Sequence, residues 1–69
     1  MKNNIKVERA KNDMTQAQLA DKIGVSRQTI NATEKGKYIP STLLALKMAK
    51  VFKCTVEDIF EMEDSDDNA

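Results

Sequence analysis

The sequence predicts an all-α domain of five short helices, and three observations carry this prediction. Residues suited to capping helix N-termini recur along the chain, and the segments that follow them have apolar side chains at helical spacing. Glycines stand where two of these segments end. The 69 residues allow one small core, so the helices must pack closely on one another.

The first helix is expected over roughly Ile5 to Asn12, after a short polar start in which Asn3 or Asn4 could supply the cap. This segment lacks strand-like alternation, although a short N-terminal strand could pair with residues near Phe60. The side chains expected to point inward, or to close the end of the helix, are Ile5, Val7, Ala10 and Met14.

The next two helices are joined by a tight turn. Thr15 and Gln18 form a capping box that starts the second helix, and Gly24 is placed to end it in the left-handed conformation. Ser26 can cap a third helix two residues later, and Gly36 is placed to end that one. This arrangement is a helix-turn-helix. The apolar stripe of the second helix is Ala17, Leu19, Ala20 and Ile23.

The fourth helix is expected over Thr42 to about Phe52, after a loop that Pro40 keeps extended and a cap at Ser41. Because it is the most apolar segment, we expect it to be the most buried. Its apolar residues are Leu43, Leu44, Leu46, Met48, Val51 and Phe52.

The last helix is expected from Val56 to about Phe60, because Thr55 and Asp58 resemble a capping box. Beyond it there is little to bury. We therefore expect one domain over residues 1–62 and a disordered acidic tail over residues 63–69.

Charge is segregated along the chain even though the formal net charge is zero. Residues 1–56 carry a net charge of +7, and residues 57–69 carry −7. A basic body suits a partner that bears phosphates. The acidic end is interpreted as a solvated tail; the alternatives are that it competes with DNA for the basic face or keeps a dimer soluble.

Composition argues against several classes of function. No segment approaches the ~20 apolar residues of a membrane span, and no secretory h-region is present, so we expect a cytoplasmic protein without a membrane partner. One cysteine and no histidine argue against a metal site and an enzyme, and no cofactor or small-molecule ligand is evident. Cys54 is interpreted as a half-buried structural residue, with a redox sensor as the alternative.

The third helix carries side chains of the kinds that contact DNA. The N-terminal end of such a helix reaches base edges in the major groove. The candidate base contacts are Arg27, Gln28, Asn31 and Ala32. The candidate phosphate contacts, from the start of the second helix to the loop after the third, are Gln16, Ser26, Thr29, Lys35, Lys37 and Tyr38.

The stretch MTQAQLADKIGVSRQTINATEKGKYIPS resembles the Cro/C1-type, or Xre-type, helix-turn-helix regulators, in particular small stand-alone repressors such as the cytolysin repressor. The resemblance covers roughly residues 4–60 and implies a five-helix, lambda-repressor-like fold, usually dimeric on a two-fold-symmetric operator. It also implies a structural salt bridge between Arg9 and Glu34. The positions that it matches to DNA contacts are Gln16, Ser26, Arg27, Gln28, Asn31, Lys35 and Lys37.

Two positions depart from the family's pattern. Thr33 stands where the family has mostly Ile or Leu, and its hydroxyl could bond back to the carbonyl of Thr29 or Ile30. We interpret it as natural drift or, alternatively, as a destabilising or engineered substitution. Lys53 stands where a glycine often ends the fourth helix.

Together these features predict a sequence-specific DNA-binding regulator of transcription, acting as a homodimeric repressor on a palindromic operator. The alternatives are an antitoxin or controller protein, or a protein-interaction module with the same fold; the basic, polar third helix argues against the latter. The expected dimer interface is Val51, Phe52, Val56, Ile59, Phe60 and Met62. Ile59 and Phe60 could instead close the core.

Overall fold

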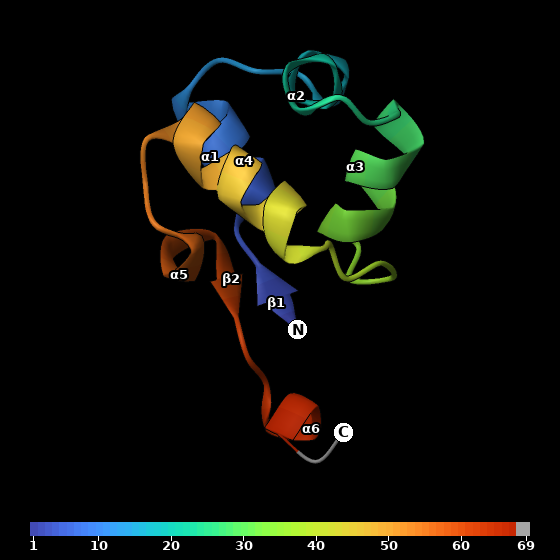
Figure 1. Ribbon diagram of the computed structural model, residues 1–69, viewed down its shortest axis with the longest axis vertical. Coiled ribbons are helices and arrows are strands. Elements are labelled where there is room, and N and C mark those ends of the chain that lie inside the picture. The colour runs from blue at the N-terminus through green and yellow to red at the C-terminus, as the bar shows by residue number, and fades with distance from the viewer. Residues whose placement is uncertain (68–69) are drawn as a thin grey trace.

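The computed structural model describes residues 1–67 as a bundle of short helices with one small sheet (Figure 1). The five expected helices are all present, and one further helical turn lies near the C-terminus. In chain order the elements are β1 (Lys2–Asn3), α1 (Ile5–Lys11), α2 (Gln16–Ile23), α3 (Arg27–Glu34), α4 (Thr42–Phe52), α5 (Val56–Ile59), β2 (Phe60–Glu61) and α6 (Asp64–Asp67).

The helix ends follow the capping residues in the sequence. The Thr15 hydroxyl accepts the backbone N–H of Gln18 at 3.0 Å, and the Gln18 side chain accepts the Thr15 N–H at 2.9 Å. Gly24 ends α2 at φ 74°, a left-handed conformation that strains other residues. Ser26 then caps α3, so the turn between the two helices is tight.

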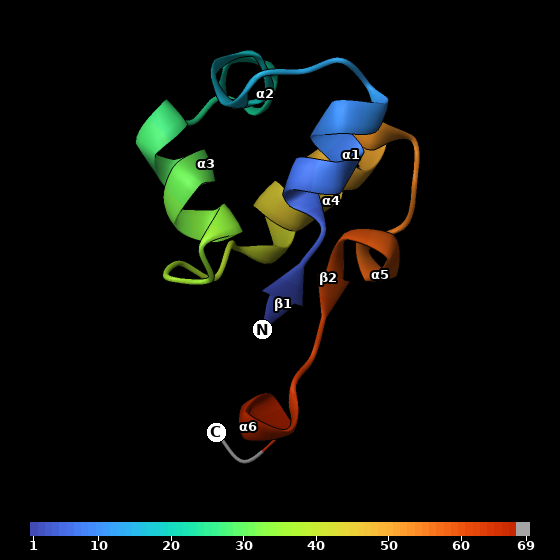
Figure 2. The same cartoon turned by 180° about the vertical axis from the view of Figure 1, so that it is seen from behind.

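The strand pairing that the sequence left open is present. β1 and β2 are antiparallel, with Lys2 opposite Glu61 and Asn3 opposite Phe60. Figure 2 shows this small sheet beside α5, with the N-terminus at its outer end. The Asn3 side chain also donates to the carbonyl of Thr33 at 2.8 Å, which ties the sheet to α3.

The core lies where α1, α2, α3, α4 and α5 converge. α2 packs on α3 and α4, and α4 packs on α5. Within residues 1–67, every buried side-chain nitrogen and oxygen has a hydrogen-bond partner. The buried apolar residues are Ile5, Leu19, Ala20, Ile23, Ile30, Leu44, Ala45, Met48, Ala49, Phe52 and Ile59.

Several side chains expected to point inward are exposed instead. In α1 the inward positions are Ile5 and Glu8, so Val7 and Ala10 face away from the core. In α2, Ala17 is exposed. The same error recurs in α4: its buried stripe runs along Leu44, Ala45, Met48, Ala49 and Phe52, which leaves Leu43 and Leu46 exposed. A helix buries only one stripe, and apolar content alone does not identify which one.

The two departures from the family's pattern have local consequences. Thr33 is buried, and its hydroxyl donates to the carbonyl of Thr29 at 2.7 Å, as the sequence suggested. This bond removes the penalty of an unsatisfied buried hydroxyl. Lys53 ends α4 at φ 57°, the left-handed conformation in which glycine is favoured.

The segment expected to be a disordered acidic tail contains one helical turn. Asp64–Asp67 forms one helical turn, α6, which lies apart from the helical body in Figures 1 and 2. The Met1 ammonium group contacts Glu63 at 3.0 Å and Asp66 at 3.2 Å, and these partners raise its pKa. Residues 68–69, the end of the expected tail, lie outside the described residues.

Candidate nucleic-acid interface

α3 buries one face and presents the other. Ile30 and Thr33 lie in the interior, while Arg27 and Gln28, in the first turn, are exposed. Asn31 and Ala32, one turn further on, are half-buried. The four candidate base contacts therefore divide into two that project fully and two that lie closer to the body. In Figure 1 α3 forms one side of the molecule.

The candidate phosphate contacts lie around this helix. The Ser26 hydroxyl accepts the backbone N–H of Thr29 at 3.1 Å and lies 3.0 Å from the Thr29 hydroxyl, so both residues belong to the cap of α3. Lys35 and Lys37 are exposed on the segment that follows α3. Tyr38 beside them is 46% exposed. The sixth candidate, Gln16, is half-buried at the start of α2.

An ion pair joins α1 to α3, as the resemblance implies. Arg9 Nε lies 2.7 Å from Glu34 Oε2, and Arg9 Nη2 lies 3.1 Å from Glu34 Oε1. The two side chains are only 14% and 10% exposed. Arg9 also donates to the carbonyl of Met14 at 2.9 Å. This arginine on α1 therefore contacts both α3 and the segment that joins α1 to α2. A bidentate pair of this kind fixes geometry.

Two amide side chains extend this network toward the exposed face. Gln16 Nε2 donates to Glu34 Oε1 at 3.2 Å. Asn31 Nδ2 lies 3.5 Å from Gln16 Oε1, at the limit of a hydrogen bond. The candidate contact residues Gln16 and Asn31 are therefore connected to the Arg9–Glu34 pair, a link that the sequence did not predict. The helical spacing of Asn31 and Glu34 is the signal that could have suggested it.

A second surface, the apolar groove, lies between the start of α4 and the α5–β2 corner. It encloses about 190 Å³. Leu46, which lines it, is 55% exposed and lies off the buried stripe of α4, a position that the sequence did not identify. The residues that line the apolar groove are Met1, Pro40, Ser41, Thr42, Ala45, Leu46, Val56 and Phe60.

The expected dimer-interface residues divide between this groove and the core. Phe52 and Ile59 are 5% and 0% exposed, so their side chains complete the core and offer a partner no surface. Val56 and Phe60 line the apolar groove, and Met62 nearby in the chain is 62% exposed. The sixth residue, Val51, is half-buried and packs against the core.

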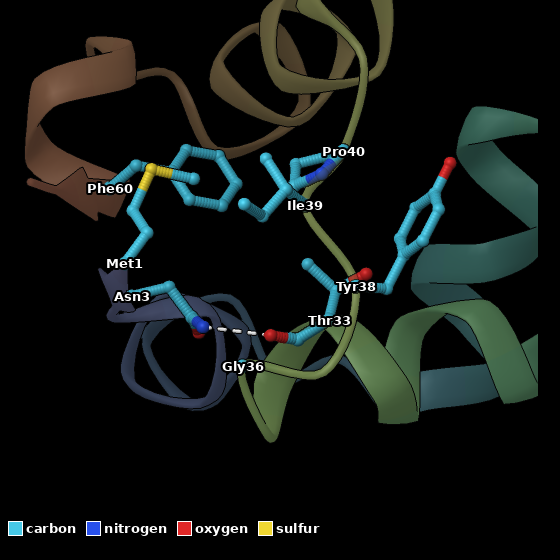
Figure 3. Close-up of a pocket in the computed structure, with 8 residues that line it drawn as sticks. All are labelled: Met1, Asn3, Thr33, Gly36, Tyr38, Ile39, Pro40 and Phe60. Atoms are coloured by element: carbon cyan, nitrogen blue, oxygen red, sulfur yellow. Dashed lines mark hydrogen bonds between the residues drawn. The ribbon is translucent and has the colours of Figure 1, made fainter. Parts of the chain in front are cut away.

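A much smaller cavity, of about 10 Å³, lies beneath Thr33 (Figure 3). Its walls include Thr33, Ile39 and Phe60, and the bond from Asn3 to the Thr33 carbonyl crosses one side of it. This volume is about that of one water-sized probe. It marks the place where a larger side chain at position 33 would extend.

Three further features bear on other kinds of site. Across residues 1–67, no three potential metal-ligating side chains gather in one place. None of the helices in that range is long and apolar enough to cross a membrane. The thiol of Cys54 packs against the core, and its burial, followed by the nearby Glu8 and Asp58 carboxylates, raises its pKa. A raised pKa disfavours the reactive thiolate, which agrees with a structural role.

Comparison with known proteins shows the family. The helix-turn-helix family model matches residues 5–59. A helix-turn-helix transcriptional regulator of Methanocaldococcus jannaschii is 58% identical over 96% of this chain and 100% of its own length. The regulator YgzD of Bacillus subtilis is 48% identical over 93% of this chain and 97% of its own. These relatives are named as regulators, in keeping with a non-enzymatic protein.

Solved structures give the same result. The P22 c2 repressor, crystallised with a synthetic operator, aligns with a TM-score of 0.73 at 28% identity, over 77% of this chain and 80% of that one. A LexA repressor from Eubacterium rectale aligns with a TM-score of 0.76 at 34% identity, over 88% of this chain and 65% of its own. The chain belongs to the helix-turn-helix family of DNA-binding transcriptional regulators.

Proposed function

We propose that this protein is a cytoplasmic, homodimeric repressor that binds a palindromic operator and blocks transcription by occupying it. The observation that carries the proposal is the division of α3 into a buried face and a polar face whose first turn is exposed. This is the geometry with which a recognition helix enters the major groove. The solved complex of the P22 c2 repressor with an operator supports it by analogy.

Base recognition is assigned to four side chains. The Arg27 guanidinium can donate two hydrogen bonds to guanine, and the Gln28 amide can pair with adenine through a donor and an acceptor. Asn31 offers an amide one turn on, and Ala32 offers methyl contact to thymine. Each bidentate pair is worth about 1–3 kcal/mol of discrimination between bases.

Phosphate contacts position the helix in the groove. The assigned residues lie at the cap of α3, at the start of α2 and on the segment after α3, so they can fix the register of the helix while base contacts specify sequence. They are Gln16, Ser26, Thr29, Lys35, Lys37 and Tyr38. The net charge of +7 in residues 1–56 favours association with DNA and makes binding fall steeply with salt.

The dimer is assigned to the apolar groove, with Val56, Phe60 and Met62 as the expected interface residues that remain available. On α4, Leu46 is 55% exposed and Leu43 is 64% exposed, and both add apolar surface to this side of the protein that no other side chain covers. A second copy of the chain buries such surface symmetrically. Two α3 helices would then meet half-sites about one helical turn apart, roughly 34–36 Å.

Selection of bound sequences from a random duplex library, at fixed moderate salt, tests the DNA-binding part of the proposal. We expect a palindromic motif that loses preference at defined positions in Arg27→Ala and Gln28→Ala. Salt-sensitive binding without any motif would contradict sequence-specific repression. Absence of binding would favour a protein-interaction module.

Sedimentation of Leu46→Glu tests the dimer. A carboxylate in the apolar groove should convert a dimer into a 7.8 kDa monomer without unfolding it, because Leu46 is more than half exposed. Val7→Glu is the matched control, since Val7 is 51% exposed on α1 and does not line the apolar groove. A wild-type protein that is monomeric at micromolar concentration would contradict the dimer.

A further inference from the structure

Asn3 in β1 contacts three other elements of the fold. Its side-chain Nδ2 donates to the carbonyls of Thr33 at 2.8 Å and Glu34 at 3.5 Å, the last two residues of α3. Its Oδ1 accepts the backbone N–H of Ile5, the first residue of α1, at 3.3 Å. In the sheet it lies opposite Phe60 of β2. One half-buried residue therefore joins the end of the candidate recognition helix to the small sheet.

Both ends of the Asn3 amide are used in these contacts. The carbonyls at the end of a helix lack partners within the helix and carry the negative end of its dipole, so they require a donor. The N–H groups at the start of a helix lack acceptors and require an oxygen. Asn3 supplies the donor to α3 and the acceptor to α1. An ionised aspartate at the same position could supply only the acceptor.

The strand opposite Asn3 forms part of the apolar groove. Phe60 lines that groove, and it is also a wall of the small cavity beneath Thr33, which Asn3 and Thr33 line as well (Figure 3). The backbone N–H of Asn4 donates to the Ile59 carbonyl at 2.7 Å, which continues the contact between this segment and the α5–β2 corner. One strand and one amide therefore separate the apolar groove from the end of α3.

The two ends of α3 are held by different kinds of contact. At the N-terminal end, Ser26 caps the helix from the residue directly before it. At the C-terminal end the anchors come from distant parts of the chain: Arg9 of α1 contacts the Glu34 side chain, and Asn3 donates to the carbonyls of the last turn. The exposed candidate base contacts lie in the first turn, so a change of tilt at the C-terminal end moves them relative to the rest of the domain.

From these contacts we infer that Asn3 is a positioning residue for DNA recognition, which sets the tilt of α3 against the strand that carries Phe60. A second copy in the apolar groove then fixes the tilt of both α3 helices, and with it the half-site separation that the dimer accepts. The inference rests on the proposed homodimer and its palindromic operator, and it deepens both. It makes dimerisation and base recognition energetically coupled events.

Operators with altered spacing between the half-sites test this role. The probe is the palindromic duplex selected by the wild-type protein, prepared also with one base pair added to or removed from its centre. Each change moves the half-sites by about 3.4 Å along the duplex and rotates one against the other, so the wild type should bind both altered duplexes much more weakly. Asn3→Asp places a carboxylate against the α3 carbonyls. This variant should bind the original duplex several-fold more weakly and discriminate less among the three duplexes, because α3 is no longer held at one tilt.

Asn4→Asp is the matched control. It adds the same negative charge one residue away, and the Asn4 side chain donates to the Asp58 carbonyl at 3.3 Å rather than to α3. It should keep the wild-type ratio of affinities among the three duplexes. If Asn3 served stability alone, Asn3→Asp would lower the folded fraction and weaken all three duplexes by one factor. An unchanged ratio for Asn3→Asp therefore overturns the inference while the proposed function stands. If the wild type selects no palindrome, the proposed function fails and the inference with it.

A measurement on the wild-type protein covers the case in which Asn3→Asp does not fold. The backbone N–H of Gly36 donates to the same Thr33 carbonyl as Asn3, at 3.0 Å. The NMR signals of that N–H and of the Asn3 side-chain NH₂ should shift together as the protein is diluted from dimer to monomer. The side-chain signals of Asn12, which donates to the Glu8 carbonyl at 2.8 Å, should stay constant. Constant Asn3 and Gly36 signals across the transition would overturn the coupling. A protein that is monomeric at every concentration would contradict the dimer, and the inference with it.

Discussion

α3 and α4 are consecutive helices that are held in place by different means. α3 buries only Ile30 and Thr33, and its other anchors are polar: the Glu34–Arg9 pair and the bond from Asn3 to the Thr33 carbonyl. α4 buries five side chains, four of them aliphatic or thioether and one aromatic, and still leaves two leucines exposed at 64% and 55%. Because polar contacts hold α3 in place, its exposed face can be polar. By contrast, α4 has two large apolar side chains that the fold of one chain leaves exposed.

The largest expected effect tests the polar anchor of α3. Glu34→Ala should lower the free energy of unfolding by about 3 kcal/mol, because it leaves the Arg9 guanidinium largely buried without its partner. A domain of 69 residues has only about 3–10 kcal/mol in total, so the variant should be close to unfolded. Urea denaturation at a fixed protein concentration measures the loss.

The double variant Arg9→Met/Glu34→Leu is the control for that measurement. Apolar side chains of similar size should restore most of the stability, because no buried charge remains. DNA affinity should stay low, since Gln16 has lost the carboxylate that orients its amide. A loss below about 1 kcal/mol for Glu34→Ala alone would mean that the pair behaves as an exposed surface pair.

The next largest effect separates two neighbouring leucines of α4. Leu44→Ala should cost about 2–3 kcal/mol, since Leu44 is 7% exposed in the core. Leu43→Ala should change the free energy of unfolding by less than about 0.5 kcal/mol, because that side chain is 64% exposed. Thermal melting of both variants, at a concentration where the protein is monomeric, gives the comparison. Equal losses would contradict the orientation of α4.

Much of the fold could be predicted from residues that set the ends of helices through interactions with their near neighbours in sequence. Thr15, Gly24 and Ser26 act through hydrogen bonds and backbone conformation within a few residues, and the structure has helix ends at each of them. The orientation of the helices was less predictable. Leu43 and Leu44 are chemically equivalent, and only the direction from which the other helices pack distinguishes them. The exposure of Val7 was unpredictable for the same reason: only the packing of the other helices on α1 decides that Ile5 and Glu8, and not Val7, are buried.

The candidate site shows the same division between features that local sequence defines and features that depend on how the helices pack. Arg27 and Gln28 follow from their place after a helix cap, which local sequence defines. The link from Glu34 through Gln16 to Asn31 depends on α1, α2 and α3 meeting at one point.

A smaller effect comes from replacing the buried Thr33 side chain of α3 with an apolar one. Thr33→Ile should raise the free energy of unfolding by about 1–2 kcal/mol, because an ethyl group replaces the buried hydroxyl and extends toward the cavity of about 10 Å³ in Figure 3. The Thr29 carbonyl, which the lost hydroxyl contacted, remains within the helical hydrogen-bond pattern. The melting temperature should rise by roughly 4–8 °C per kcal/mol. An unchanged midpoint would contradict a destabilising role for Thr33.

The smallest expected effect concerns the end of α4. Lys53→Gly should raise the free energy of unfolding by about 0.5–1 kcal/mol, because glycine adopts φ 57° without the strain of a side chain. Lys50→Gly, three residues earlier within the helix, should lower it by about 1 kcal/mol. The change in the free energy of unfolding on substituting glycine should thus have opposite signs at these two lysines. Melting curves that move in the same direction for both would contradict the left-handed cap, since only backbone conformation separates the two predictions.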